Sequence, residues 1–574
     1  MGEAVSITGI GIVCAIGNDA ASVLKSLREG RSGIGRAMQL DSIHSDLPVG
    51  EVSLSCNEMK RMLGADAASD ISRTSLMGAL AVREALAQAG IGSPDGRRVA
   101  LVSGTTVGVM DLTERNYERM RKNPSQCSLP LCNECGRSTL EIAALAKLEG
   151  AECCTISTAC SSALNAIIIG AEMLRNGEAD IVIAGGSEAL SKFHLNGFNS
   201  LMILDREMCR PFDGMRAGLN LGEGAAYVVL QKDAPRTLAY VSGYANRCDA
   251  FHQTASSENG EGAYLAMTGA LEMAGLKPEQ IQYVNAHGTG TQNNDQSESR
   301  AIRRVFGESL PEVSSTKSYT GHTTSASGSI ETVISILAML NGFTPSSPGW
   351  KNPMADGIVP TRGNACIHLE NVMCNSFGFG GNDSSLILSL TRPDSPAARV
   401  SAHLPVEVCA HTEVSADDDL SALREFVPPM ESRRMCRLMK VSHLSAFRAM
   451  RAAGVECPDA IISATSRGML ETSVQFLEDI IVNGETLLKP TLFMQSTHNT
   501  VASSLAVRTG CHGYNITYSQ GDDSLEWAMR DARRLIAAGN AGCVLVTAFD
   551  ETVSGTTADS CRAESFILKA KSDE

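Results

Sequence analysis

Apolar residues along the chain fall into two kinds of segment. Short runs rich in Val, Ile and Ala, without a polar face, are typical of buried strands. These runs are VSITGIGIV (5–13), VALVSG (99–104), ADIVIAGGSEA (179–189), AAYVVLQ (225–231), CIHLENV (366–372) and SSLILSL (384–390). Longer segments with helical periodicity, such as residues 73–90 and 161–177, lie between them. The alternation predicts an α/β fold in which helices cover mostly buried sheets.

The alternation stops at residues 393–405, where Pro, Ser and Arg replace periodic apolar positions. Such a composition indicates a linker. The chain has 574 residues, more than one hydrophobic core usually organises. We therefore expect one unit over residues 1–392 and a second over residues 406–574.

The second unit repeats part of the first. Two segments return at a common displacement of 360 positions: VSGTTVG (102–108) as ISATSRG (462–468), and TISTAC (155–160) as NITYSQ (515–520). A shared displacement indicates a duplication rather than chance. Residues 406–574 thus correspond roughly to residues 60–190, and this alignment puts Gln520 where the first copy has Cys160.

Composition limits the classes of function. The formal net charge of −15 argues against a protein that binds nucleic acid or an anionic membrane. The 18 cysteines are scattered, as expected of reduced thiols in a cytoplasmic protein. Cys132 and Cys135 form a Cys-x-x-Cys pair without a second pair at zinc spacing, so we expect no metal site. No apolar stretch is long enough to span a bilayer, which predicts a soluble protein.

Candidate chemistry gathers at one cysteine and two histidines. Cys160 stands between an apolar strand and a helix, where the positive end of the helix dipole favours a thiolate. His287 in NAHGTGTQNND and His322 in TKSYTGH lie among small residues that allow close approach of a ligand. A lone buried cysteine is more often inert packing, and a lone histidine is usually structural. Together, a thiol and two imidazoles suit acyl transfer through a thioester.

Five motifs in order carry a family resemblance: TACSSA, CRPFDGMRAGLNLGEGAA (209–226), NAHGTGTQNND, TKSYTGH and NSFGFGGND (375–383). With them, residues 4 to about 392 resemble the elongating β-ketoacyl-acyl carrier protein synthases of the thiolase superfamily. The resemblance implies a layered αβαβα fold for residues 1–392 and half of such a fold for residues 406–574. It also implies a decarboxylative Claisen condensation, in which a malonyl-carrier thioester loses carbon dioxide and attacks an acyl group held on Cys160.

The resemblance also implies roles for individual residues. His287 and His322 would promote decarboxylation as neutral hydrogen-bond donors, and the N–H groups of Cys160 and Phe379 would form an oxyanion hole. Phe379 would further act as a gate between acyl pockets, although a plain core phenylalanine is an alternative. The remaining implied substrate-binding positions are Thr113, Thr289, Thr291, Gly378 and Gly380. No bound cofactor is expected, because phosphopantetheine arrives on the carrier protein.

Two further positions are weighed with the same resemblance. Lys317 would support the histidine loops together with Glu298, against the alternative of a solvated loop lysine. Thr113 falls near the position that closes the acyl tunnel across the dimer interface in related enzymes, and its small side chain suggests long or unusual acyl chains.

The sequence departs from the family at two places. The last motif continues with Asn382 and Asp383 where the family usually has Thr-Asn, which puts the hydrogen bonding of this loop in doubt. The basic cluster expected for docking of an acyl carrier protein is reduced to Arg73. A basic stretch in the second unit is the alternative candidate for meeting an acidic carrier: Arg433, Arg434, Arg437 and Lys440.

Several alternatives stay open. With Gln520 in place of a nucleophile, the second unit resembles chain-length factors, the inactive partners of some ketosynthases, but a decayed duplication that merely packs is also possible. The whole chain could be a non-catalytic chain-length factor or scaffold, although intact Cys160, His287 and His322 argue against it. A thiolase would need a second catalytic cysteine, and an initiating synthase an asparagine in place of His322. The product could be a fatty acid, an aryl polyene or a polyketide, and the assembly a homodimer, a heterodimer or an internal pseudo-dimer.

Overall fold

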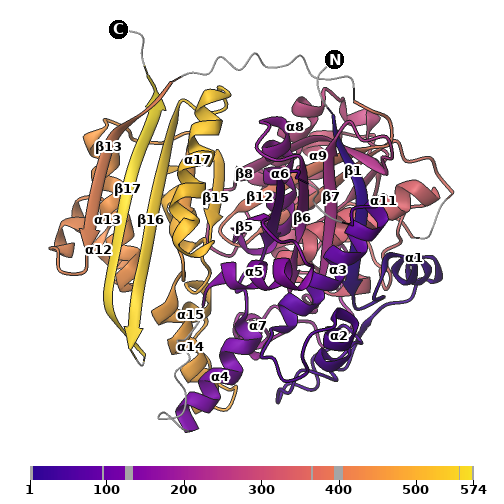
Figure 1. Ribbon diagram of the computed structural model, residues 1–574, viewed down its shortest axis with the longest axis horizontal. Coiled ribbons are helices and arrows are strands. Elements are labelled where there is room, and N and C mark those ends of the chain that lie inside the picture. The colour runs from indigo at the N-terminus through magenta and orange to yellow at the C-terminus, as the bar shows by residue number, and fades with distance from the viewer. Residues whose placement is uncertain are drawn as a thin grey trace.

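The computed structural model describes residues 4–92, 96–122, 133–362, 366–393, 405–554 and 556–571. Residues 394–404, which make up most of the expected linker, lie outside the described residues. A continuous sheet of 15 strands runs through both units, in the order β10-β9-β11-β12-β8-β1-β7-β6-β4-β5-β15-β14-β16-β17-β13 (Figure 1). The first unit supplies the ten strands from β10 to β5, and the second supplies the last five.

The N-terminal part of the first unit forms five neighbouring strands. In spatial order they are β1 (Val5–Cys14), β7 (Gly224–Lys232), β6 (Ile181–Glu188), β4 (Val99–Gly104) and β5 (Glu152–Ile156). Every residue of β1, β4 and β6 is buried, which explains why these strands read as continuous apolar runs.

The C-terminal part of the first unit forms a second set of five strands. In spatial order they are β8 (Ala239–Cys248), β12 (Asn382–Ser389), β11 (Asn371–Gly378), β9 (Tyr283–Asn285) and β10 (Glu312–Ser314). A short antiparallel contact of β1 with β8, from Val5 opposite Val241 to Ile7 opposite Ala239, joins the two sets. The strand expected from Cys366 begins later, at Asn371, because Cys366 itself is exposed and makes only an isolated bridge to Phe343.

Helices complete five layers in the first unit. Helix α3 (Arg73–Ala89) packs on β1 and β7, on the outer face of the first set of strands. Helices α6 (Ser162–Arg175) and α11 (Ser327–Asn341) lie between the two sets. Helices α8 (Glu261–Ala274) and α9 (Gln292–Phe306) cover the outer side of the second set. The predicted αβαβα fold is therefore confirmed.

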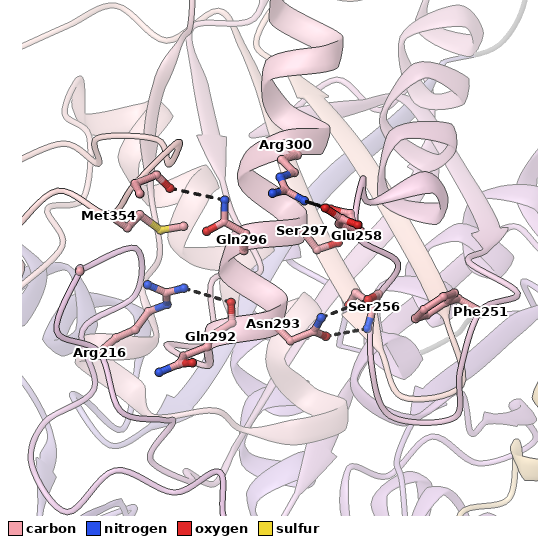
Figure 2. A pocket seen from close by; sticks show the side chains of 12 residues that line it. Arg216, Phe251, Ser256, Glu258, Gln292, Asn293, Gln296, Ser297, Arg300 and Met354 are labelled. Atoms are coloured by element: carbon pink, nitrogen blue, oxygen red, sulfur yellow. Dashed lines mark hydrogen bonds and ion pairs between the residues drawn. The ribbon is translucent and has the colours of Figure 1, made fainter.

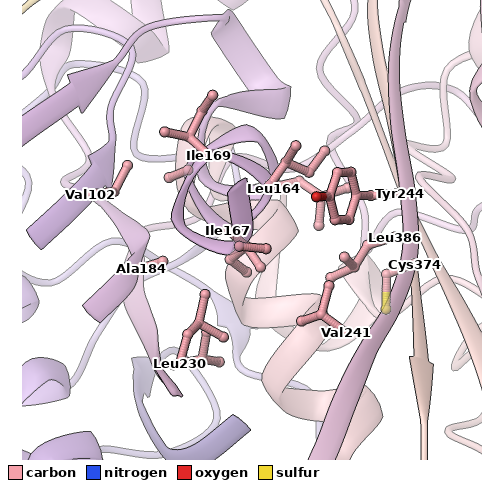
Figure 3. Close-up of a cluster of buried hydrophobic side chains, with 14 of the residues drawn as sticks. Val102, Leu164, Ile167, Ile169, Ala184, Leu230, Val241, Tyr244, Cys374 and Leu386 are labelled. Carbon is pink, nitrogen blue, oxygen red and sulfur yellow. The ribbon is translucent and has the colours of Figure 1, made fainter. Parts of the chain in front are cut away.

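Helix α6 is apolar on nearly all sides because both sets of strands cover it. Figure 3 shows Leu164, Ile167 and Ile169 on this helix, with Leu230 of β7 and Val241 of β8 among the side chains around it. The central layer thus fixes where α6 begins, and with it the residues immediately before the helix.

The other elements of the first unit surround this core. They are α1 (Ala20–Glu29), β2 (Ile34–Gly35), β3 (Val49–Gly50), α2 (Cys56–Leu63), α4 (Met110–Lys122), α5 (Cys135–Leu145), α7 (Lys192–Ser200) and α10 (Lys317–Thr320). Short 3-10 turns η2 (Ala159–Ser161), η3 (Pro278–Gln280) and η4 (Thr324–Ala326) connect them.

The second unit repeats the first set of strands. Its strands β15 (Tyr514–Tyr518), β14 (Ala460–Ala464), β16 (Cys543–Ser554), β17 (Thr557–Ala570) and β13 (Val406–Ser415) follow one another in the same spatial order as β5, β4, β6, β7 and β1. Helix α13 (Arg437–Ala452) packs on β13 and β17 as α3 packs on β1 and β7, and α17 (Ser524–Ala537) takes the part of α6. The described residues contain no counterpart of β8 to β12 in this unit.

The remaining elements of the second unit lie toward the first unit or along its edge. They are η5 (Leu420–Glu425), α12 (Pro429–Ser432), α14 (Leu470–Val482), α15 (Pro490–Met494), α16 (Thr500–Thr509) and η6 (Gly521–Asp523). Helix α14 contacts α4 and α7, and α15 contacts α7, at the bottom of Figure 1.

Strand β15 joins the two units by pairing with β5 in the antiparallel direction, with Tyr518 opposite Ile156. The N–H of Ser157 donates to the carbonyl of Thr517, and the N–H of Ser519 donates to the carbonyl of Thr155, both at 2.9 Å. Strand β5 at the edge of the first unit is therefore paired within the chain, in the arrangement of an internal pseudo-dimer. Among the described helices, none is long and apolar enough to cross a membrane.

Candidate active site

The turn between β5 and α6 presents Cys160. Ala159 has a φ of 51°, a left-handed conformation that few non-glycine residues adopt, and it turns the chain sharply after the strand. The hydroxyl of Ser162 ties the turn together, since it accepts from the N–H of Thr158 at 2.9 Å and donates to the carbonyl of Ala159 at 2.6 Å. Cys160 is 5 % exposed, which places its thiol in the interior beside the central helices.

One predicted histidine lies next to this thiol, and the second lies next to the first. His322 Nε2 is 3.2 Å from Cys160 Sγ, and His322 Nδ1 is 3.0 Å from Ser327 Oγ. The ring of His287 is 5.3 Å from that of His322, centre to centre, with the planes nearly perpendicular at 83°. Residues separated by up to 162 positions thus form one cluster of a thiol and two imidazoles.

Lys317 lies beneath the histidines and is 1 % exposed, so it is not a solvated loop lysine. Its Nζ lies 2.5 Å from Glu331 and 3.4 Å from His287 Nδ1. Glu298, the partner expected for Lys317, instead accepts the backbone N–H groups of His287 and Gly288 at 2.8 and 2.7 Å. The ion pair of Lys317 is therefore with Glu331 of the central helix α11, while Glu298 holds the histidine loop.

Electrostatics keep the cluster uncharged apart from the lysine pair. Burial raises the pKa of the Cys160 thiol to about 11, although the N–H groups of Phe379 and Cys160 and the charge of Lys317 oppose this shift. Burial, together with the charge of Lys317, lowers the pKa of both His287 and His322 well below the ordinary value. Burial therefore opposes the thiolate that the helix start was expected to favour.

The tautomer of His287 follows from Lys317. An ammonium group only donates hydrogen bonds, so His287 Nδ1 accepts from Lys317 and the ring proton is on Nε2. His287 therefore presents an N–H donor on the side away from the lysine. His322 Nε2 faces the thiol and can accept its proton.

The loop after β11 completes the site. A Cβ on Gly378 would lie 2.9 Å from the carbonyl oxygen of Thr158 and 3.2 Å from the nitrogen of Cys160, so only glycine allows this close approach. The N–H of Phe379 points at the sulfur of Cys160, as does the N–H of Cys160 itself. Two backbone donors thus converge on the atom that would carry an acyl group. The half-buried Phe379 ring stacks on Phe198 at 5.7 Å.

The two departures at the end of this loop also have structural partners. The side chain of Asn382 accepts from Ser161 and Asn165 in the nucleophile turn and donates to the carbonyl of Asn515 at 2.9 Å. Asp383 is buried, and this burial, reinforced by the nearby Asp249, raises its pKa. Asn382 thus links the nucleophile turn to β15 of the second unit.

Three expected substrate-binding positions form local hydrogen bonds. Thr289 and Thr291 share a hydrogen bond of 2.9 Å between their hydroxyls at the start of α9. Thr113 is buried in α4, where its hydroxyl donates to the carbonyl of Val109 at 3.2 Å.

An open pocket of about 700 Å³ lies beside Thr291 (Figure 2). Arg216 lines it and bonds the carbonyls of Thr291 and Gln292 at 3.3 and 3.0 Å. Its opposite side carries Phe251, which is 55 % exposed, and the ion pair of Arg300 with Glu258. The pocket therefore lies at the start of α9, next to the threonine loop.

The second unit contributes side chains that sequence reasoning missed. The amide of Asn499 donates to the carbonyl of Phe379 at 2.9 Å. The ring of Phe493 lies 5.3 Å from that of Phe198, and a Cβ on Gly197 would clash with it at 2.2 Å. Both residues lie in LFMQSTHNTVASSLAVRTG (492–510), a segment that resembles ketosynthase-like half-domains, but each contact joins distant parts of the chain, so the resemblance did not identify them as part of the site.

The alignment that put Gln520 in the place of Cys160 is wrong. Strand β15 begins at Tyr514 and β5 at Glu152, a displacement of 514 − 152 = 362. Helices α17 and α6 begin at Ser524 and Ser162, again a displacement of 524 − 162 = 362. The second copy has two additional residues before this turn, which the similarity of TISTAC to NITYSQ conceals.

With this register, Asp522 stands at the position of Cys160. Gly521, with a φ of 57°, matches Ala159 with its φ of 51°. Gln520 consequently matches the residue before Ala159 rather than the nucleophile. Asp522 is exposed and offers a carboxylate instead of a thiol, so the second unit still lacks a nucleophile for thioester chemistry.

Gln520 has a structural role instead. Its Oε1 accepts a hydrogen bond of 2.6 Å from the hydroxyl of Thr155 across the junction of the units. A Cβ on Gly136 would come within 3.1 Å of the Gln520 backbone, which shows how closely α5 approaches it. Gln520 therefore stabilises the contact between β5 and β15.

The two candidate basic regions differ in accessibility. Arg73 is buried and forms an ion pair with Glu223 at 2.6 Å, so it cannot meet a carrier protein. Arg433, Arg434 and Arg437 are exposed where α12 ends and α13 begins. No carboxylate among the described residues forms an ion pair with Arg433 or Arg434.

Possible metal ligands lie away from the cluster. Within the described part of the chain, His411, Glu413 and Glu564 are the group whose ligand atoms come within 4.8 Å of one another, on the outermost strands β13 and β17. His411 and Glu413 are exposed, and such groups are common without a metal. Cys132 of the Cys-x-x-Cys pair lies outside the described residues.

Comparison with known families matches both units. Residues 2–235 match the family described as "Beta-ketoacyl synthase, N-terminal domain", and residues 238–351 match the corresponding C-terminal domain. Residues 408–560 match a second family with the same N-terminal-domain description. The duplication predicted from sequence is thereby supported.

Similar proteins cover mainly the first unit. Nodulation protein E of Rhizobium meliloti (strain 1021) is 32% identical over 426 residues, covering 67% of this chain and 99% of that protein. The 3-oxoacyl-[acyl-carrier-protein] synthase 2 of Vibrio cholerae serotype O1 is 32% identical over 407 residues, covering 67% of this chain and 98% of that protein.

Two solved structures extend the comparison. The ishigamide ketosynthase/chain length factor is 30% identical with a TM-score of 0.64, covering 68% of this chain and 100% of that one. The PfaC keto synthase-chain length factor has a TM-score of 0.80 and covers 99% of this chain and 78% of that one. At 17% identity, the PfaC match shows the shared fold of both units.

Proposed function

Because the chain belongs to the β-ketoacyl synthase family, we propose that it condenses a malonyl-carrier thioester with an acyl group held on Cys160. The observation that carries this proposal is the arrangement of groups around one sulfur atom. The imidazole of His322 and the N–H groups of Cys160 and Phe379 lie at the sulfur, and the imidazole of His287 lies beside that of His322. A thiol, a proton acceptor and two oxyanion donors are what acyl transfer requires.

In the first step, Cys160 takes the acyl group. As the thiol attacks the thioester carbonyl of the acyl carrier, its proton passes to His322 Nε2, 3.2 Å away. The N–H groups of Cys160 and Phe379 stabilise the oxyanion. The tetrahedral adduct collapses to acyl-Cys160, and the departing carrier thiolate takes the proton from His322.

In the second step, a malonyl-carrier thioester enters and loses its carboxylate as carbon dioxide. The electron pair of the broken bond forms an enolate. Its oxygen receives a hydrogen bond from the Nε2–H group of His287 and, once the ring proton of His322 has moved from Nδ1 to Nε2, a second one from His322. Neutral imidazoles with a lowered pKa suit this role, because they donate without being protonated further. The enolate carbon attacks the acyl carbonyl, and Cys160 leaves as the thiolate and is reprotonated.

The second unit forms part of the acyl site in this proposal. Phe493 and Phe476 pack against Phe193 and Phe198, and Phe198 stacks on the gate candidate Phe379. An acyl chain extending from Cys160 would therefore meet a wall built by α14 and α15. This gives the second unit the role of a chain-length factor fused to its ketosynthase.

The carrier surface is proposed to include Arg433 and Arg434. The carbonyl of Arg434 accepts from the side chain of Gln495 at 2.7 Å. Gln495 lies four residues before Asn499, in the turn between α15 and α16, and Asn499 contacts the Phe379 loop. These exposed arginines are thus close in structure to the oxyanion loop. An acidic carrier protein docked there could deliver its phosphopantetheine arm to Cys160.

The proposal is tested by mass spectrometry of the full chain after incubation with an acyl-carrier protein, with Cys160→Ala as the control. An acyl adduct on Cys160 that is discharged by malonyl-carrier protein supports it. If no cysteine is acylated, the proposal is wrong. That result would favour the alternative that the whole chain is a non-catalytic scaffold or chain-length factor. Product analysis with primers of graded length then distinguishes fatty acid, aryl polyene and polyketide synthesis.

A further inference from the structure

Two side-chain hydrogen bonds connect the units beside Cys160. One comes from Asn499 of the second unit, and the other comes from Asn382 of the first unit. Asn499 Nδ2 donates to the carbonyl of Phe379 at 2.9 Å, and Asn382 Nδ2 donates to the carbonyl of Asn515 at the same distance. The hydrogen bonds join residues 120 and 133 positions apart. They therefore form only when the second unit is docked on the first.

Asn499 makes its contact at the expense of a local one. It is the N-cap residue of α16, a position where asparagine normally accepts a hydrogen bond from its own helix, yet it makes no such bond. Its Oδ1 is buried without a partner among the described residues. Since the carbonyl of Phe379 only accepts, the amide of Asn499 must turn its NH₂ group toward it. The same NH₂ group also lies 3.3 Å from Ser503 Oγ of its own helix, so its shorter bond of 2.9 Å is the one to the neighbouring unit.

The loop also lies directly against α16. Gly380 has a φ of 87°, and a Cβ there would come within 2.0 Å of Ser503 Oγ and 3.0 Å of Asn499 Nδ2. The N–H of Gly380 donates to the carbonyl of Gln253 at 2.6 Å. The peptide group between Phe379 and Gly380 is thus held at both ends, by Asn499 at its oxygen and by Gln253 at its nitrogen.

The corresponding residue of the first unit provides a contrast. Glu134 is the N-cap residue of α5, the helix that precedes β5 as α16 precedes β15. The second unit has no counterpart of the Phe379 loop among the described residues, and Glu134 instead bonds Arg467 at 3.2 Å. An amide donor is present at this position only where an oxyanion loop faces it.

We propose that Asn499 is a positioning residue for the oxyanion hole of the first unit. By holding the carbonyl of Phe379, it limits rotation of the loop and keeps the adjoining N–H of Phe379 directed at the sulfur of Cys160. Misplacement of a group by about 1 Å can reduce a rate about 100-fold. This inference rests on the proposed function of Cys160 as the acyl acceptor, and it assigns to the second unit a part in forming the active site.

The test compares Asn499→Ala and Asn499→Asp in the full chain. The aspartate has the same shape but presents only oxygen atoms to the carbonyl of Phe379, so it should be the more harmful change. Asn133→Ala is the matched control, because Asn133 Nδ2 donates to the carbonyl of Arg467 at 2.9 Å across the same junction without touching the loop. Each variant is acylated with an acyl-N-acetylcysteamine thioester, and separately alkylated with iodoacetamide.

Only acylation forms an oxyanion, so the two reactions separate positioning from general damage. We expect both Asn499 variants to acylate Cys160 about 10- to 100-fold more slowly, with alkylation within about twofold of the wild type. Asn133→Ala should leave both rates within about twofold. Acylation by the Asn499 variants at the wild-type rate would overturn the inference, as would a parallel fall in alkylation.

The same experiment separates this inference from the proposed function. If the wild type is acylated by the small thioester but makes no product with malonyl-carrier protein, the condensation proposal fails. The acylation rates of the Asn499 variants then still test whether Asn499 positions the oxyanion hole. If the wild type is not acylated at all, both fail.

Discussion

Lys317 and Glu331 show how single buried residues set the chemistry of the site. Both side chains are almost inaccessible, at 1% and 3% exposure, and they form an ion pair beside His287. Burying two charges costs solvation free energy that their attraction only partly repays, so such pairs are seldom kept for stability alone. Here the lysine fixes the tautomer of His287 and disfavours protonation of both histidines.

Replacing Lys317 with Met should therefore reduce both stability and activity. The lost cation leaves Glu331 buried and unpaired, and the free energy of unfolding should fall by about 3–5 kcal/mol, measured by urea denaturation. The double variant Lys317→Met with Glu331→Leu should recover most of this stability without restoring malonyl decarboxylation. Recovery of activity in the double variant would show that the pair acts only in folding.

The protonation of His287 and His322 gives a testable dependence on pH. Burial and the charge of Lys317 lower their pKa values in the folded chain, so we expect His287 and His322 to stay neutral below pH 6.5, where a free imidazole is protonated, as measured by ¹⁵N NMR of the rings. The unfolded chain takes up these protons near pH 6.5, so their burial lowers the stability of the fold as the pH falls below that value. Titration of either ring near pH 6.5 in the native protein would contradict this account.

The sequence alone was sufficient for residues whose role lies in a local motif. Cys160, His287 and His322 lie in distinctive sequence motifs rich in small residues, and the structure brings them together. Glu331 and Asn499 could not be predicted, because a carboxylate on an apolar helix and an N-cap asparagine acquire their roles only through distant contacts. Asp522, the structural counterpart of Cys160, was missed because the alignment followed the similar sequences TISTAC and NITYSQ rather than the equivalent strands and helices.

Among the elements, α14 and α15 have the clearest effect on the proposed acyl site. Their aromatic side chains Phe476 and Phe493 pack edge-on or tilted against Phe193 of α7. The duplication gave no indication that these helices face the first unit, because their packing partners are set by the docking of β15 on β5.

Phe493→Ala should lengthen the products. Removing this ring leaves a cavity beside Gly197 and Phe198, which should lower the free energy of unfolding by about 3–5 kcal/mol and allow a longer acyl chain. Phe447→Ala is the matched control, since Phe447 is similarly buried in the second unit but stacks on Phe426 away from the junction. Mass spectrometry of the products should show longer chains for the first variant only; unchanged lengths in both would remove α15 from the acyl site.

On the scale of the whole molecule, the chain is an asymmetric pair. The order of strands from β1 to β5 is mirrored from β15 to β13, yet only the first unit continues into the second set of strands. The repeated text made the duplication predictable. The sequence left three assemblies open, because the pairing of β5 with β15 depends on docking of two edges and not on any local pattern. In this arrangement the unit without a nucleophile contacts the loop that serves the nucleophile.

The exposed arginines Arg433 and Arg434, between α12 and α13, belong to the second unit only. We therefore expect the second unit to bind the carrier protein. The chain carries a net charge of −15, so an acidic carrier would be repelled by most of its surface and attracted by a local basic patch. Reversing Arg433 and Arg434 to Glu should raise the KM for an acyl-carrier protein about 10-fold or more. The turnover of the corresponding N-acetylcysteamine thioester, which needs no docking, should stay within about twofold.

The matched control reverses Arg533 and Arg562, two exposed arginines of α17 and β17, and changes the net charge by the same amount. If charge acts at the docking surface, only the first pair should raise KM, and added salt should reduce the difference between the wild type and that variant. An equal rise for both pairs would instead indicate an effect of total charge. An unchanged KM in the Arg433 and Arg434 variant would place carrier docking elsewhere, and the pocket beside Thr291, with Arg216 and Arg300, would then be the next surface to reverse.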